Sequence, residues 1–217
     1  MSYIAYGVFY EGSSDAAYFD VLIPKVLEDI LLDAGEPLVE YPAQPTHHFG
    51  SGNRAIDTVA KEICAAQGEI HIVFIHADTG GRGLEEHLHA HSTAYCERAH
   101  EECAFCQDHC IPLIVRHETE AWLLADPAAL RSALGYNGAL DIPSNAKDAE
   151  GLQDPKAVLA AAVSCAKGRR FKPRDIGRLM PSVAQKQNIS ELRRSVSFEV
   201  VYGRTRRALE AVGVVRP

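Results

Sequence analysis

The stretch of sequence that best indicates the fold is IHIVFIHAD, residues 70–78, which is almost entirely apolar as far as Ile75. Such a run is typical of a strand that is covered on both faces, as in a parallel sheet. Two further segments, YIAYGVFY at residues 3–10 and IPLIVR at residues 111–116, have the same character. The sequence therefore predicts an α/β fold with an open parallel sheet and helices on both of its faces.

Helices are expected between and after these strands, because apolar residues recur there at helical spacing. A short additional strand is expected near residues 38–41, and Pro24 should kink or divide the first helix. We expect a core over residues 1–126 and a basic helical extension over residues 127–217, packed together as one structural unit. The predicted helices cover residues 16–31, 54–66, 84–109, 128–134, 155–166 and 197–212.

The composition is that of an ordinary globular protein, with 47% hydrophobic and 24% charged residues. No apolar run approaches the roughly 20 residues that span a bilayer, and the first residues lack a basic leader, so we expect a cytoplasmic protein without membrane contact. Because the cytosol keeps thiols reduced, the six cysteines are expected to be free or to bind a metal.

Charge is unevenly distributed along the chain, although the net charge is −7. Basic residues crowd the last quarter, whereas acids follow the predicted strands, which suits a phosphate-rich partner such as nucleic acid. Solvated helix faces are the alternative interpretation of the same charges. The residues expected to bind phosphate are Arg82, Lys156, Arg169, Arg170, Lys172, Arg193 and Arg194.

Acids follow three predicted strands directly, and the carboxyl ends of parallel strands meet at one edge of a sheet. Carboxylates held that close favour a divalent cation, here Mg²⁺ or Mn²⁺. Each acid taken alone is also an ordinary turn former or a helix-terminal residue. The expected metal ligands are Glu11, Asp15, His76, Asp78 and Glu118. The expected catalytic residues are Glu11, Asp78 and Glu120.

Two of these segments resemble the motifs of the Toprim fold: FYEGSSDAAYF at residues 9–19 and HAD at residues 76–78. The longer segment RHETEAWLLADPAAL at residues 116–130, with DPK at 154–156 and the Ser197-Phe198 pair, resembles a bacterial Toprim-like family of unknown function related to OLD-type nucleases. This resemblance implies a glutamate as general acid or base and aspartates that hold Mg²⁺. His76 departs from the Asp-x-Asp motif and favours a softer ion or lost activity.

A second candidate metal site lies in CERAHEECAFCQDHC, residues 96–110. Four sulfur ligands would close a tetrahedral zinc site, here Cys96, Cys103, Cys106 and Cys110. Buried cysteines on a helix are the alternative, because no second pair with this spacing occurs elsewhere in the chain.

Taken together, these features predict a metal-dependent nuclease of the Toprim type, acting in phage defence or DNA repair, with a separate ATPase as a possible protein partner. Two alternatives use the same residues. One is a non-catalytic binding module that keeps the fold after His76 has ended metal chemistry. The other is a phosphohydrolase that acts on a small substrate.

Overall fold

The computed structural model describes residues 3–10, 12–52, 54–78, 92–103, 105, 107–172 and 174–216. Its centre is a four-stranded parallel sheet in the order β2-β1-β3-β4. The open parallel sheet predicted from the sequence is therefore confirmed. The strands are β1 (Tyr6–Phe9), β2 (His47–Phe49), β3 (Ile72–Asp78) and β4 (Cys110–Val115).

The register of the sheet brings the ends of β3 and β4 together. His76 pairs with Leu113 and Asp78 pairs with Val115, so the two strands leave the sheet at the same level. The acidic segment after Val115 therefore begins beside the end of β3.

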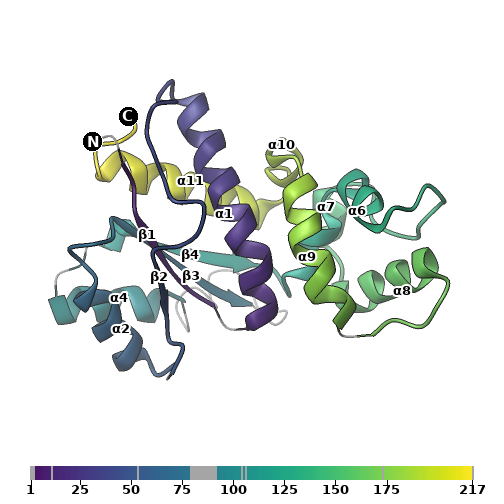
Figure 1. The fold of residues 1–217 in the computed structure, drawn as a ribbon, viewed down its shortest axis with the longest axis horizontal. Helices are drawn as coiled ribbons and strands as arrows, with labels where there is room; N and C mark the ends of the chain where they lie inside the picture. The colour runs from purple at the N-terminus through teal and green to yellow at the C-terminus, as the bar shows by residue number, and fades with distance from the viewer. Residues whose placement is uncertain are drawn as a thin grey trace.

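Helices cover both faces of this sheet, as the alternation of patterns predicts (Figure 1). The first helix runs unbroken across Pro24, so the predicted division does not occur. The helices are α1 (Ser13–Asp33), α2 (Ile56–Ala65), α4 (Thr93–Cys103), the 3₁₀ turn η2 (Gln107–His109), α5 (Glu120–Leu124), α6 (Pro127–Leu134), α7 (Ala146–Glu150), α8 (Pro155–Lys167), α9 (Arg174–Lys186), α10 (Ile189–Leu192) and α11 (Val196–Ala211).

One face of the sheet supports a large core built from both halves of the chain. Helix α1 crosses this face in Figure 1, helices α6 to α10 lie to one side of it, and α11 extends to its other side. Tyr18 of α1, Trp122 of α5 and Phe198 of α11 are all buried in this core. Polar contacts join the same elements, because Tyr18 donates to Gln187 Oε1 at 2.7 Å and Gln187 Nε2 donates to the Trp122 carbonyl at 2.6 Å.

The opposite face carries a smaller core under α2 and α4. Val59 and Ile63 of α2 pack there with Val73 and Ile75 of β3. Helix α4 contributes few fully buried side chains, Cys96 and Ala99, while Tyr95 and Cys103 are partly buried against this core.

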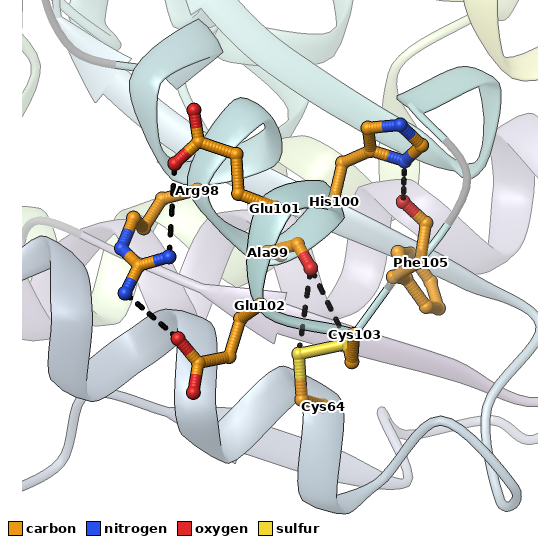
Figure 2. Close-up of a disulfide and its surroundings, with 8 residues drawn as sticks. All are labelled: Cys64, Arg98, Ala99, His100, Glu101, Glu102, Cys103 and Phe105. Carbon is orange, nitrogen blue, oxygen red and sulfur yellow. Dashed lines mark hydrogen bonds and ion pairs between the residues drawn. A yellow bond between two sulfur atoms is a disulfide. The ribbon is translucent and has the colours of Figure 1, made fainter.

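Two disulfides tie this smaller core together. Cys64 of α2 is bonded to Cys103 at the end of α4, and Cys96 of α4 is bonded to Cys110 of β4. Figure 2 shows the first bond beside the Ala99 carbonyl, which lies 3.5 Å and 3.3 Å from the two sulfur atoms. The expectation that these cysteines are free or bind zinc was therefore wrong, because their sulfur atoms are joined in pairs.

Two expected elements differ in the structure, and four helices were not expected. Residues 38–41 form no strand beyond a single bridge between Tyr3 and Glu40, and β2 lies instead in the following segment, where we predicted no strand. The predicted long helix near residues 84–109 is described only from Thr93, and it ends at Cys103 before the turn η2. Helices α5, α7, α9 and α10 were not predicted, since three of them are short and α9 contains Pro181, which in a sequence indicates a helix break although this helix runs through it.

No helix within the described ranges combines the length and the apolar character needed to cross a membrane.

Candidate functional site at the carboxyl edge of the sheet

A buried chain of polar side chains lies where α1 begins and where β3 and β4 end. Thr119, in the loop before α5, donates its hydroxyl to Asp15 Oδ1 at 3.0 Å. The same hydroxyl oxygen lies 3.3 Å from His76 Nε2, and Asp15 Oδ2 lies 3.7 Å from that nitrogen. Three segments that are distant in the sequence therefore meet in one hydrogen-bonded group.

His76 is fully buried inside this group. Its Nδ1 lies 3.2 Å from the Leu113 carbonyl oxygen, which can only accept, so this nitrogen carries a proton. Its ring also packs on Phe19, with the ring centroids 4.5 Å apart. Both ring nitrogens thus face atoms of the protein.

Gly12 allows the Asp15 carboxylate to lie close to the backbone. A Cβ atom at Gly12 would come within 2.7 Å of Asp15 Oδ2. The carboxylate could yield only by leaving its position beside Thr119. A glycine is therefore required at position 12 for a steric reason: any side chain there would collide with the Asp15 carboxylate.

A second acidic group adjoins the first. The Glu120 side chain is 7% exposed and the Glu118 side chain is 34% exposed, and Lys156 Nζ of α8 lies 3.8 Å from an oxygen of each. Burial raises the pKa of the Glu120 carboxyl, and the nearby charges of Glu118 and Asp15 act in the same direction, whereas Lys156 partly opposes the shift. Glu120 thus holds a proton to a higher pH than an exposed glutamate does.

The backbone between β4 and these acids is strained. His117 has a φ of 70°, which places it in the left-handed region. A residue with a Cβ atom occupies that region at a cost of roughly 1–2 kcal/mol. Such strain is common at functional sites, where the surrounding structure holds a side chain in an unfavourable place.

The structure brings several of the predicted site residues together. Asp15, His76, Glu118 and Glu120 lie along one edge of the sheet, as their positions after the strands predict. Glu11 and Arg82 lie outside the described residues, and only the backbone of Asp78 is described, at the end of β3.

The predicted metal sites are not supported. Within the described part of the chain, no group of three or more His, Cys, Asp or Glu side chains could hold a metal ion. The expectation of Mg²⁺ or Mn²⁺ on Asp15, His76 and Glu118 was wrong, because His76 faces Leu113 and Thr119 while Glu118 faces Lys156. The expected zinc site was wrong for Cys96, Cys103 and Cys110, which form disulfides, and Cys106 lies outside the described residues.

Sequence reasoning missed Thr119, whose hydroxyl contacts both Asp15 and His76. A hydroxyl between two acids in HETEAW was the available signal, but the sequence pattern does not show that it points inward.

Other residues on which the family resemblance rests stabilise the helices around the candidate site. Asp154 accepts from Ala157 N at 2.8 Å and caps α8. Ser197 accepts from Trp122 Nε1 at 2.9 Å and donates its own N–H to the buried Glu150 carboxylate at 2.8 Å. These contacts fix helices, and they place Lys156 at the site by fixing the first turn of α8.

Several of the predicted phosphate-binding residues have acidic partners within the protein. Arg169 is paired with Asp175 at 2.8 Å, Arg193 with Glu199 at 2.8 Å, and Arg194 with Glu191 at 2.9 Å. Arg193 also lies over the Tyr202 ring, 4.0 Å from its centroid. Arg170 and Lys172 are exposed, and no ion pair involves either of them among the residues that the structure describes.

Comparisons of the chain with family models, curated proteins and solved structures find no match.

Proposed function

We propose that this chain cleaves phosphodiester bonds of a nucleic acid at the carboxyl edge of its sheet. The observation that carries the proposal is the buried Glu120 carboxyl, which has a raised pKa and lies beside the Lys156 ammonium. Carboxyl groups with shifted pKa values gather at functional sites, and ligands of open α/β sheets bind beyond the carboxyl ends of the strands.

Each residue has a role in this proposal. Water attacks the phosphorus atom while the bond to the leaving oxygen breaks. Asp15, held by Thr119, accepts a proton from the water, and Glu120 donates its retained proton to the leaving oxygen. Lys156 balances the negative charge of the phosphate.

The resemblance of FYEGSSDAAYF and HAD to Toprim motifs supports this class of reaction, because Toprim proteins act on nucleic-acid phosphodiesters. The same resemblance supports a role in phage defence or DNA repair, with an ATPase as a protein partner. Fold and motif likeness support a substrate class by analogy, so the reaction itself has to be measured.

A nicking assay tests the proposal directly. Purified protein is incubated with supercoiled plasmid, single-stranded DNA and RNA, each with and without a chelator. We expect Glu120→Gln to lower the rate of cleavage by about 10²- to 10⁴-fold, the usual contribution of a general acid. The matched control is Glu97→Gln on the exposed surface of α4, which should cleave like the unchanged protein.

Three outcomes would contradict the proposal. Equal rates for Glu120→Gln and Glu97→Gln would remove Glu120 from the chemistry. Hydrolysis of mononucleotides without cleavage of polymers would favour the small-substrate phosphohydrolase. Binding of nucleic acid without cleavage under any condition would favour the non-catalytic module.

A further inference from the structure

The loop between α8 and α9 is ordered by one buried carboxylate. Asp175 is 4% exposed, and it accepts from Lys167 Nζ at 2.9 Å and from both terminal nitrogens of Arg169 at 2.8 Å and 3.0 Å. It also accepts from the Lys172 backbone N–H at 3.0 Å. Hydrogen bonds from Arg169 and Lys167 hold the pKa of Asp175 well below its usual range. The carboxylate therefore stays charged and fixes the loop on both sides of its turn.

Four other cations on this loop and on the first turns of α9 remain exposed to solvent. They share one property: among the described residues, none of them takes part in an ion pair. We call these four residues the basic surface: Arg170, Lys172, Arg174 and Arg178.

Two arginines elsewhere in the molecule show the contrasting arrangement, in which the cation is paired with an acid. Arg98 lies 2.7 Å from both Asp57 and Glu102, and Figure 2 shows its side chain directed toward Glu102. Arg206 is paired with Asp33 at 2.7 Å. A chain with a net charge of −7 has ample acids to pair its cations, yet it leaves four neighbouring ones unpaired. Clustered cations repel one another, and an anionic partner would relieve that repulsion.

The position of the basic surface relates it to the candidate site. Helices α1 and α9 pack against each other, and both begin on the same side of the molecule, at the lower side of the view in Figure 1. The first turn of α1 carries Asp15, and the first turn of α9 carries Arg174. Helix α8 connects the candidate site to the basic surface, because Lys156 lies in its first turn and the loop that carries Arg170 and Lys172 follows its last turn.

We infer that the basic surface binds the phosphate backbone of a nucleic acid strand whose scissile bond lies at the candidate site. The choice of nucleic acid rests on the proposed function. Arg174 and Arg178 are separated by about 6 Å along the helix, and Arg170 and Lys172 extend the surface onto the loop. A row of cations of this extent suits successive phosphates of a polymer better than one phosphate group. Because Asp175 orders the loop in advance, little conformational entropy is lost on binding.

Salt-dependent binding tests this inference. Fluorescence anisotropy measures the affinity of labelled DNA and RNA strands across a range of salt concentrations, with Glu120→Gln as the background to prevent cleavage. The test variant replaces the basic surface: R170Q, K172Q, R174Q and R178Q. The matched control replaces four exposed cations that have no ion pair within the described residues: K61Q, K147Q, K186Q and R207Q.

Both variants have the same net charge, because each loses four positive charges from the same Glu120→Gln background. We expect the slope of log affinity against log salt to fall in magnitude by about 3 to 4 in the test variant, because each lost phosphate contact removes about 0.7 to 0.9. The control should keep the slope of the parent protein. Equal losses in the two variants, or equal binding by heparin and nucleic acid, would overturn the inference.

A second variant tests the ordering by Asp175. Asp175→Asn raises the net charge by one, so charge alone would tighten binding, whereas a loosened loop weakens it. We expect weaker binding at low salt. Tighter binding would overturn the role that we assign to the ordered loop.

Hydrolysis of a small chromogenic phosphodiester separates this inference from the proposed function. The test variant, without Glu120→Gln, should hydrolyse this substrate at the parent rate while it loses affinity for strands. If the parent protein binds strands but hydrolyses no substrate, and the test variant binds strands more weakly, the proposed function fails and the binding surface stands. If it cleaves strands and the test variant binds like the parent, the binding surface fails alone.

Discussion

The two faces of the sheet are stabilised in different ways. The face under α1 and α11 buries many large side chains, such as Trp122 and Phe198, and hydrogen bonds such as the one from Trp122 Nε1 to Ser197 cross its core. The face under α2 and α4 buries fewer, and α4 is joined to its neighbours by Cys64–Cys103 and Cys96–Cys110. Covalent bonds therefore hold α4 on the face where fewer apolar side chains are buried.

Reduction of both disulfides should produce the largest loss of stability. The bonds close loops with sequence separations of 39 and 14 residues. Restricting the unfolded chain by such loops contributes about 4 and about 3 kcal/mol, and the overlap of the loops makes the joint effect smaller than the sum. Urea unfolding with and without dithiothreitol measures the loss.

Cys165→Ser is the control for this experiment, because Cys165 is an exposed free cysteine. It should unfold at the same urea concentration as the parent protein. An unchanged midpoint after verified reduction would show that the smaller core holds α4 without its covalent bonds.

Trp122→Ala should give the next largest loss, in the larger core. Trp122 is 1% exposed and packs on Phe198 with ring centroids 4.9 Å apart. Replacing a buried tryptophan by alanine costs about 3–5 kcal/mol, through lost burial and the cavity that remains. Urea unfolding measures the change, and Trp122→Phe should lose less. If dithiothreitol lowered the stability of the parent protein and of Trp122→Ala by clearly different amounts, the two faces of the sheet would be coupled.

Glu120→Gln should raise the stability of the protein and not lower it, because this residue lies in the candidate site and not in either core. Burial raises the pKa of Glu120 in the folded protein above its unfolded value. Stability is therefore fully present below the unfolded pKa and falls as the pH rises through the folded pKa. The variant escapes this fall, so it should melt at a higher temperature than the parent at neutral pH.

Thermal melting across pH 3 to pH 8 tests that sign. The two proteins should melt alike at the acidic end, where both side chains are uncharged, and diverge as the pH rises. A variant that melts lower than the parent at neutral pH would show that the Glu120 carboxylate stabilises the fold, through its backbone hydrogen bond and the Lys156 ammonium.

His117→Gly should produce the smallest effect, a gain of about 0.5 kcal/mol. Glycine removes the cost of a positive φ, and its greater freedom in the unfolded chain offsets part of that gain. Arg116→Gly is the matched control, because the adjacent residue has no positive φ and should lose stability. Losses of equal size in both variants would show that the loop stores no strain.

Much of the fold follows from local pattern. Residues 72–75 and 111–115 are buried on both faces, which requires a nearly continuous apolar run, and such runs are visible in the sequence. Helices α6, α8 and α11 were predicted within one or two residues, because their apolar spacing and their caps are local features. The prediction of a strand near residues 38–41 was wrong, because the three residues of β2 form a strand only by pairing with β1, and local composition does not show that pairing.

The candidate site was predictable in part for a similar reason. Asp15, His76, Glu118 and Glu120 follow or end parallel strands, so topology alone brings them to one edge. The metal prediction failed because it assumed that these side chains point toward a common centre. Hydrogen bonding to Thr119 and Leu113, and the position of Lys156, turn them toward other atoms.

Local patterns in the chain were enough to predict the parallel sheet, the helices on both faces and the edge where acids gather, because burial and strand direction produce those patterns. The three-dimensional packing was needed to learn which cysteines are bonded, which arginines are paired and which way His76 and Glu120 point. These choices depend on contacts between residues far apart along the chain, such as Cys64 with Cys103 and Asp15 with Thr119. Composition and spacing contain no record of such contacts, because they are made only when the helices pack on the sheet.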